Sequence, residues 1–443
     1  MTDKNQLYYF TRFVSEETFD AAKLRAYKDG TVLECNDFAV FAFGVAYRFS
    51  VTNGLRDHQA LHEIQKKLDG IIEINISDLE QTSSPNARPV AEQEKTHFTQ
   101  STLPNPIAIG ALDFIPDTEV KIFFPQLAFL RHRDHHPAVI AVAHIDELLD
   151  IHRNLPNYFS DTDATIDNLC PDEFNLHSLH THEHFLNSVR DAVKLINSSE
   201  LEKVVLARKI TVKANRKFNR AILLERLRTL HPSCLTFAIG DFIGASPELL
   251  IKKEGAHIIS SPLAGTIARS GVTEEDKELA DHLVSSEKNL LEHNYVVSYI
   301  MDKLSAFCNK EIERPYPELL FLRNVTHIQS NITGELKAPY AGILELVSAL
   351  HPTPAVAGIP LEASLEAIHR FEEVPRHQYG APLGFVEKGG NGTFYLGIRS
   401  AWIKGNTAEL MAGVGIIKDS DPSDELTETQ LKLQALLAAI VRP

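Results

Sequence analysis

The stretch Leu201-Glu202-Lys203-Val204-Val205-Leu206-Ala207-Arg208 places one lysine in a run that is otherwise largely aliphatic. Such a run is typical of a buried strand, which we expect over residues 203–212. An ammonium that loses its hydration gives up its proton more readily, so Lys203 is a candidate base near neutral pH. The alternative is a strand-end lysine whose long side chain returns its charge to water.

A carboxylate follows in the segment Gly244-Ala245-Ser246-Pro247-Glu248-Leu249. A base and an acid on separate segments are able to act on two ends of one bound substrate. The sequence therefore makes Glu248 the candidate acid that complements Lys203.

Hydrophobic periodicity extends this pattern on both sides of the lysine strand. Apolar residues at helical spacing predict helices over 185–196, over 274–308 as one or two helices, and over 425–441. Strand-like runs occur at 30–40, 41–51, 394–401 and 409–417, and a polar stretch at 81–106 predicts a loop. The chain has no Gly-x-Gly-x-x-Gly motif and no phosphate-binding loop, so the pattern favours an α+β fold with antiparallel sheets.

The composition of the chain indicates which classes of partner it is expected to bind. The chain has 443 residues, a length that suggests two or three domains, with 44 basic and 59 acidic side chains and a net charge of −15. This balance argues against nucleic acid or an anionic membrane as the main partner. The N-terminus is polar, no apolar run reaches the roughly 20 residues of a membrane span, and the four cysteines are widely spaced. These features together predict a cytoplasmic protein.

Two groups of histidines lie in polar segments: His132, His135 and His136 in one, and His177, His180, His182 and His184 in the other. A zinc site needs three or four ligands that converge in a dry environment. Neighbouring histidines in polar loops rarely meet that condition. We therefore interpret both groups as solvated surface rather than as metal sites.

Two predicted helices carry acidic residues at suggestive positions. One contains Glu287 and Glu292, and the other contains Glu425, Glu428 and Lys432, which share one helix face. An exposed, salt-bridged helix explains this spacing. The alternative is a Mg²⁺ site, because Mg²⁺ takes one or two protein carboxylates and completes its shell with water and ligand oxygens.

Groups suited to an anion occur in three further segments. Small residues around Gly413 and Thr266 would let backbone N–H groups approach a ligand closely. Arg399 is able to clamp a carboxylate with two hydrogen bonds. Each of these features is also compatible with a tight turn or a salt bridge.

Taken in order, these segments resemble the chorismate-utilising enzyme family, which includes anthranilate, aminodeoxychorismate, isochorismate and salicylate synthases. The resemblance runs from Phe185 to the C-terminus. The motifs that carry it are Lys203-Val204-Val205-Leu206-Ala207-Arg208, Ser246-Pro247-Glu248, Pro262-Leu263-Ala264-Gly265-Thr266, Glu292-His293, Leu350-His351-Pro352-Thr353-Pro354-Ala355-Val356, Arg376 with Tyr379, Ile398-Arg399-Ser400, and Glu425, Glu428, Thr429 and Lys432. The resemblance implies an anthranilate synthase component I-like α+β fold, with large mixed or antiparallel sheets flanked by helices. It also implies that 185–443 is the catalytic region and that 1–184 is a divergent N-terminal half of the same unit.

Three features select a branch of the family. Lys203 stands where the water-adding members carry their base. Ala264 stands where aminodeoxychorismate synthases carry a nucleophilic lysine, and the segment that begins Leu350-His351-Pro352 is similar to that of isochorismate synthases. The resemblance therefore implies Mg²⁺-dependent conversion of chorismate to isochorismate, with Lys203 as base and Glu248 as acid.

The remaining roles are also implied by the resemblance. Glu292 and Glu428 would hold Mg²⁺, and the substrate chorismate would contact Thr266, His351, Tyr379, Arg399, Gly413 and Lys432. No glutaminase subunit is expected, and a monomer is favoured. The alternative function is salicylate synthase, which forms isochorismate and then eliminates pyruvate. Whether the product feeds menaquinone, a siderophore or salicylate stays open.

Overall fold

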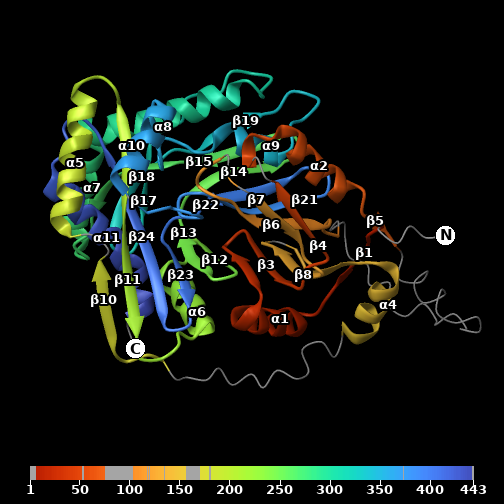
Figure 1. Ribbon diagram of the computed structural model, residues 1–443. Helices are drawn as coiled ribbons and strands as arrows, with labels where there is room; N and C mark the ends of the chain where they lie inside the picture. The colour runs from red at the N-terminus through yellow and green to blue at the C-terminus, as the bar shows by residue number, and fades with distance from the viewer. Residues whose placement is uncertain are drawn as a thin grey trace, which may run out of the picture.

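The computed structural model describes residues 6–51, 54–74, 103–116, 118, 120–133, 135–155, 170–178, 181–372 and 374–441. Most of the predicted loop over 81–106 lies outside these residues, as does His180. Among the described residues, nearly all the regular structure belongs to two large β-sheets and the helices that cover them (Figure 1).

The larger sheet has 13 strands within the described chain and is antiparallel except for the parallel pair β1–β5. Its strands, in spatial order, are β10 (Phe174–Ser178), β11 (Lys203–Ala214), β24 (Thr407–Ile416), β23 (Ser400–Lys404), β13 (Phe242–Ser246), β12 (Leu235–Ile239), β2 (Thr31–Glu34), β3 (Phe38–Phe43), β8 (Leu127–His132), β9 (Ala138–Ala143), β1 (Tyr8–Phe13) and β5 (Ile72–Glu73), with β20 (Gly358–Ile359) beside β11. The sheet thus joins strands from both ends of the chain.

The second sheet has eight strands and the third has three among the described residues. The second runs β19 (Ile332–Glu335), β15 (His257–Ser261), β14 (Leu249–Glu254), β22 (Gly392–Leu396), β21 (Pro382–Glu387), β6 (Ile107–Ala111), β7 (Val120–Phe124) and β4 (Tyr47–Val51). The third consists of β16 (Leu263–Ala268), β18 (Val325–Gln329) and β17 (Glu318–Phe321).

Helices cover the outer faces of these sheets. They are α1 (Glu16–Asp29), α2 (His58–Asp69), α4 (Ile145–Asn154), α5 (His182–Asn197), α6 (Arg220–Leu230), α7 (Thr273–Ser285), α8 (Glu287–Ser305), α9 (Ile343–Leu350), α10 (Leu361–Glu372) and α11 (Pro422–Val441), with a 3₁₀ turn at Gly54–Arg56. In Figure 1, α5 and α11 lie at the left beside β11, whereas α1 and α4 lie toward the lower right. The α+β fold with large mixed and antiparallel sheets is confirmed.

Strand β3 shows how the sequence builds these layers. Alternate side chains of a strand point to opposite faces of the sheet. Phe38, Val40 and Ala42 join the core shared with the eight-stranded sheet. Ala39, Phe41 and Phe43 join the core under the helices. The strand reads as an unbroken apolar run because both of its faces are covered.

Three strand predictions were wrong in their boundaries. The runs 30–40 and 41–51 form three strands, β2, β3 and β4, and β3 continues through the predicted boundary between Val40 and Phe41. The run 394–401 is also broken, because β22 ends at Leu396 and β23 begins at Ser400 in the other large sheet. Arg399 takes a left-handed backbone conformation at this break, with φ of 51°.

The other predicted elements are confirmed. The strand at 203–212 is β11, the strand at 409–417 is β24, and the two pair in antiparallel register. The region 274–308 forms two helices, α7 and α8, and the helix at 425–441 is α11. The predicted face of α5 buries Phe185, Val189, Ala192 and Ile196.

Candidate active site

A narrow cavity of about 70 Å³ lies between the ends of these elements, and seven of the ten predicted site residues line it. They are Glu248, Thr266, Glu292, Tyr379, Arg399, Gly413 and Lys432. The fold therefore gathers residues from β16, β24, α8, α11 and three connections into one place. The other three predicted site residues are not among the described residues that line the cavity; they are Lys203, His351 and Glu428.

Lys203 is the first residue of β11 and its side chain is fully buried. Its Nζ lies 3.0 Å from Oε1 of Glu292 on α8. The lysine therefore sits directly behind a residue that lines the cavity. The alternative of a lysine that reaches out to water is excluded by its complete burial.

Gly415 on β24 makes room for this ion pair. A Cβ atom at Gly415 would lie 2.2 Å from Oε1 of Glu292 and 2.9 Å from Cε of Lys203. Real contacts of that length do not occur, so any side chain here would displace the pair. The Gly-rich segment was predicted to bring backbone N–H groups close to a ligand. At Gly415, however, the absence of a side chain leaves space for the side chains of Glu292 and Lys203.

Glu248 lies in the connection between β13 and β14 and is 4% exposed. Burial raises the pKa of its carboxyl to about 7, although the Leu263 N–H and the cations Lys203 and Lys432 act in the opposite direction. Its Oε1 accepts a weak hydrogen bond of 3.4 Å from the Leu263 N–H. A carboxyl with a pKa near neutrality is suited to donate a proton to a substrate.

Glu292 behaves differently in the same cavity. Burial acts to raise the pKa of this carboxyl, but Lys203, Lys432 and Lys288 outweigh it and hold the pKa below its ordinary value. Glu292 is therefore a carboxylate at neutral pH, whereas Glu248 is partly protonated. The two glutamates of this cavity thus differ in their protonation at neutral pH, which is typical of carboxyl groups that have different roles in one site.

Helices α8 and α11 bring further carboxylates and lysines together. Lys432 pairs with Glu428 at 2.7 Å, and Lys288 pairs with Glu425 at 2.8 Å. Burial, followed by repulsion from Glu428, raises the pKa of Glu425 to about 7. Carboxylates from two helices thus gather around Lys288 at one end of the cavity.

This donor set fits a hard divalent cation. Glu292 and Glu428 offer oxygen ligands from two helices, and Mg²⁺ needs only one or two protein carboxylates when water and a ligand complete its octahedron. In the part of the chain that the structure describes, no group of three or more His, Cys, Asp or Glu side chains is placed to hold a metal. The protein alone therefore does not form a closed metal cage in this region.

Arg399 supplies the anion-binding group. Its left-handed backbone turns the side chain into the cavity between β22 and β23. Its Nη2 donates to Nε2 of His327 at 2.9 Å, and its Nη1 is buried without a partner among the described residues. A buried N–H that lacks an acceptor is costly unless a ligand provides one.

His327 is a site residue that the sequence reasoning missed. It pairs with Thr266 across β16 and β18, and its Nδ1 lies 3.1 Å from the Thr266 hydroxyl. Burial, together with the charges of Arg399 and Lys432, keeps the pKa of His327 well below its ordinary value. The neutral ring accepts from Arg399 at Nε2 and so carries its proton on Nδ1, toward Thr266. The only signal in the sequence is that a buried strand contains a polar ring.

The bulge at Gly265 explains why Thr266 faces the cavity. The β16–β18 register shifts by one residue between Ala264 and Thr266, and Gly265 has φ of +79°. A bulge of this kind turns the following side chain. Thr266 thereby meets both His327 and the cavity.

Gly413 and Tyr379 also line the cavity. The Gly413 carbonyl accepts a hydrogen bond of 3.0 Å from Nζ of Lys432. A Cβ at Gly413 would lie 3.2 Å from the Tyr379 hydroxyl oxygen. Gly413 thus orients Lys432 and leaves space for Tyr379, in addition to any contact that its N–H makes with a ligand.

His351 is buried outside the cavity. Its Nε2 donates to the Phe114 carbonyl at 3.0 Å, and burial lowers its pKa to about 4. The segment that follows it brings Ala355 and Val356 to the lining. His351 therefore anchors this segment, and it lies outside the described lining of the cavity.

A buried ion pair holds that segment against β11. Glu372 pairs with Arg376, and Glu372 also accepts from the Ala207 N–H at 2.7 Å. Arg376 donates to the carbonyls of Val356 and Val205. Both charges are fully hydrogen-bonded, as a buried pair requires.

The histidine groups lie at the surface where they are described. His135, His136, His177 and His182 are exposed, and His132 is half-buried. His184 lies half-buried at the start of α5, where its N–H is capped by Thr181.

A cavity with a buried acid, a buried lysine behind its lining and an arginine whose Nη1 lacks a partner among the described residues is suited to an anionic ligand. The family model described as chorismate binding enzyme matches residues 31–441, and the chain belongs to this family. The match begins far upstream of Phe185, where the recognisable motifs start.

Named relatives agree with this assignment. Isochorismate synthase MenF of Bacillus subtilis is 38% identical over 58% of this chain and 55% of its own length. The vibriobactin-specific isochorismate synthase of Vibrio cholerae is 29% identical over 76% of this chain and 79% of its own. The crystal structure of DhbC from Bacillus anthracis superposes with a TM-score of 0.75 and 28% identity over 95% of this chain and 99% of that one.

The alignment thus spans just over half of the Bacillus subtilis protein. Among the described residues, no helix is both long enough and apolar enough to cross a membrane.

Proposed function

We propose that this chain is an isochorismate synthase, a Mg²⁺-dependent isomerase that converts chorismate reversibly to isochorismate. The observation that carries the proposal is that the buried acid Glu248 lines one cavity together with Arg399, while the buried Lys203 lies directly behind Glu292 in the lining of the same cavity. The names of the aligned relatives support it.

In the proposed reaction, a water molecule adds to C2 of the ring as the C4 hydroxyl leaves, and the ring double bonds shift between these carbons. Lys203 in its neutral form takes a proton from the attacking water. Glu248 gives a proton to the departing hydroxyl, which leaves as water. One water enters and one leaves, so atoms balance, and proton exchange with solvent restores both side chains. The two events occur at different ring carbons, which is why the acid and the base come from different elements.

Lys203 lies behind Glu292, so the proposal requires Glu292 to turn away from the ammonium before catalysis. We assign Mg²⁺ to Glu292 and Glu428; when bound, it would neutralise the ring carboxylate of the substrate and fix its position. Glu292 would then have a counter-ion other than Lys203, which leaves the lysine free to become neutral.

The remaining residues bind and orient the substrate in this proposal. The unpartnered Nη1 of Arg399, with Lys432 and Tyr379, would receive the enolpyruvyl carboxylate, and the Gly413 backbone would support Lys432. Thr266 would face the ring hydroxyls, with its own oxygen already accepting from His327. We assign His351 to the support of this pocket. Residues 185–443 would form the catalytic region, with 1–184 as the N-terminal half of the same α+β unit.

Incubation of the purified protein with chorismate and Mg²⁺, followed by chromatographic separation of the products, tests the proposal. We expect isochorismate at equilibrium with chorismate, no turnover in EDTA, and recovery of turnover when Mg²⁺ is returned. Salicylate and pyruvate as the main products would instead identify a salicylate synthase. A protein that leaves chorismate unchanged in Mg²⁺ would contradict both assignments.

A further inference from the structure

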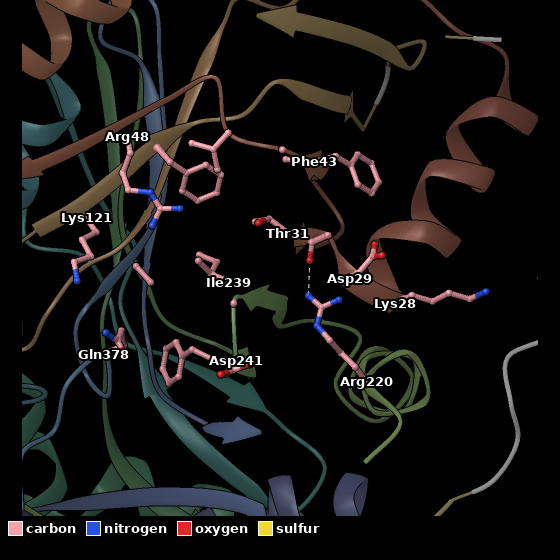
Figure 2. Close-up of a pocket in the computed structure, with 18 of the residues that line it drawn as sticks. Lys28, Asp29, Thr31, Phe43, Arg48, Lys121, Arg220, Ile239, Asp241 and Gln378 are labelled. Atoms are coloured by element: carbon pink, nitrogen blue, oxygen red, sulfur yellow. Dashed lines mark hydrogen bonds between the residues drawn. The ribbon is translucent and has the colours of Figure 1, made fainter. Parts of the chain in front are cut away.

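A large cavity among the described residues lies away from the active site. It is a groove of about 940 Å³ between α1, the β4–β7 pair and the β12–β13 hairpin (Figure 2). We call it the cationic groove, because five basic side chains line it against two acidic ones: Arg25, Lys28, Arg48, Lys121 and Arg220 against Asp29 and Asp241. In a chain with a net charge of −15, this local excess of positive charge is unusual.

The sheet geometry places two of these cations on one wall. Arg48 on β4 pairs with Phe123 on β7, and Ser50 pairs with Lys121. Arg48, Phe123 and Lys121 therefore project from the same face of the strand pair, since alternate residues share a face. Figure 2 shows Arg48 and Lys121 on this side of the groove, with Lys28 and Arg220 across from them. Like charges held on both walls favour an anionic occupant.

The basic side chains of the groove differ in the contacts that they already make within the protein. Arg220 donates to the carbonyls of Ala26 and Tyr27 at the end of α1, and Arg25 pairs with Asp29 at 2.9 Å. Arg48 is exposed and makes no hydrogen bond or ion pair with the described residues. Arg48 is therefore the guanidinium best placed to clamp a carboxylate from solution.

Aromatic side chains form the floor of the groove. The rings of Phe242 and Trp402 lie 5.1 Å apart with an interplanar angle of 32°. The Trp402 indole N–H donates to Oε1 of Gln378 at 2.9 Å, which orients the Gln378 amide beside it. A flat ring would stack on this floor while its charge meets the arginine.

The groove and the active site share a wall. Trp402 packs against the cluster of Ala207, Tyr379 and Met411, and both Tyr379 and Met411 line the catalytic cavity. Gln378, which holds Trp402, is the residue before Tyr379. The two cavities are thus distinct but separated by a single layer of side chains.

We propose that the cationic groove is a second binding site, which takes a small aromatic carboxylate with its ring on Phe242 and Trp402 and its carboxylate on Arg48. The volume of about 940 Å³ leaves ample room for such a ligand. Since the site lies outside the catalytic cavity, binding does not require turnover.

Trp402 is the only tryptophan of the chain, so its fluorescence reports directly on the groove. The experiment titrates the full-length protein with benzoate and follows the tryptophan emission. Benzyl alcohol serves as the uncharged ring and inorganic phosphate as the ringless anion. We expect a saturable change with benzoate and none with the other two probes. An equally tight response to benzyl alcohol or phosphate would contradict the proposed recognition.

Two variants locate the binding. Arg48→Ala should raise the dissociation constant for benzoate about fivefold or more, while its KM for chorismate stays unchanged. Arg190→Ala removes the same charge from an exposed site on α5 and should bind benzoate like the wild type. Arg399→Ala, which alters the catalytic cavity, should also retain benzoate binding. Equal affinity in Arg48→Ala and the wild type, or loss of binding in Arg399→Ala, would overturn the proposal without bearing on the activity assignment.

Discussion

The catalytic cavity and the cationic groove differ in size, enclosure and charge pattern. The cavity measures about 70 Å³ and is lined or backed by lysines that each pair with a carboxylate, whereas the groove measures about 940 Å³ and has more basic than acidic side chains in its lining. Burial shifts the pKa of Glu248 to about 7 in the cavity. The proposed chemistry is therefore assigned to the place where opposite charges are buried together, and the proposed second binding site to the larger volume.

The strongest test of this contrast compares two lysines on β11. Lys203→Ala should lower kcat about 10³-fold, because general base catalysis contributes roughly that factor. Lys209→Ala is the matched control, since Lys209 lies on the same strand, pairs with Glu409 and stays partly exposed. Initial rates of isochorismate formation measure both. Similar rates in the two variants would remove Lys203 from the mechanism.

Gly415→Ala tests whether the buried ion pair needs its space. The added methyl group would meet Glu292 and Lys203, so we expect turnover to fall about 100-fold, as when a catalytic group is misplaced by about an ångström. Gly342→Ala is the control, because a Cβ at Gly342 meets no atom within 4 Å. Thermal unfolding of both variants should stay close to the wild type. Full activity in Gly415→Ala would contradict the role of the pair.

The pH dependence tests the acid. Since the pKa of Glu248 is raised to about 7, its proton is lost above that pH, and the protonated fraction of this carboxyl should fall about tenfold per pH unit on the alkaline side. Removal of the titrating carboxyl in Glu248→Gln should therefore change the shape of the kcat/KM profile above pH 7. Glu425→Gln should keep the wild-type shape even though burial also raises the pKa of Glu425 to about 7, because Glu425 lies outside the cavity lining. The same profile in Glu248→Gln as in the wild type would exclude Glu248 as the acid.

The same carboxyl should affect stability with a defined sign. Its pKa is about 7 in the folded protein and near the ordinary 4.5 when unfolded, so the unfolded state ionises first as pH rises. The folded state therefore loses stability between pH 4.5 and 7, on the order of 2 kcal/mol. Glu248→Gln lacks this loss, so urea midpoints of the variant and the wild type should diverge in favour of the variant from pH 5 to pH 8.

The smallest expected effect concerns His327. His327→Ala removes the acceptor of Arg399 and the partner of Thr266, so KM for chorismate should rise about fivefold, the cost of one hydrogen bond, while kcat changes less. His327→Asn, which retains an acceptor, should recover part of the affinity. A fall in kcat without any change in KM would point to a role other than orientation of Arg399.

The sequence was informative where a local pattern repeats a structural period. The helix faces of α5 and α11 and the strands β11 and β24 follow from apolar spacing. Lys203 and Glu248 stood out because charged residues rarely occur in apolar runs. The strand prediction over 394–401 failed because most of its residues are apolar or small, although the backbone turns sharply at Arg399 to enter another sheet.

Contacts between segments that are distant in the chain could not be predicted from the sequence. His327 has only a weak local signal, a polar ring in a buried strand, because its importance comes from its contacts with Thr266 and with Arg399 on another connection. Gly415 is one of 22 glycines in the sequence. Only the close approach of Glu292 in the folded chain shows why no larger residue fits at this position. His351 was singled out by its motif, but its hydrogen bond to the Phe114 carbonyl joins segments far apart in the sequence, which no local pattern predicts.

The sequence by itself determined the α+β class, the chemical groups of the site and the family that they resemble, because these depend on residue identity and local periodicity. The tertiary structure decided which charges meet. It placed Glu292 rather than Glu248 against Lys203, because Glu292 on α8 reaches the first residue of β11 beside the end of β24, where Gly415 leaves room. Electrostatic interactions depend on distance and burial, and only the folded chain sets these.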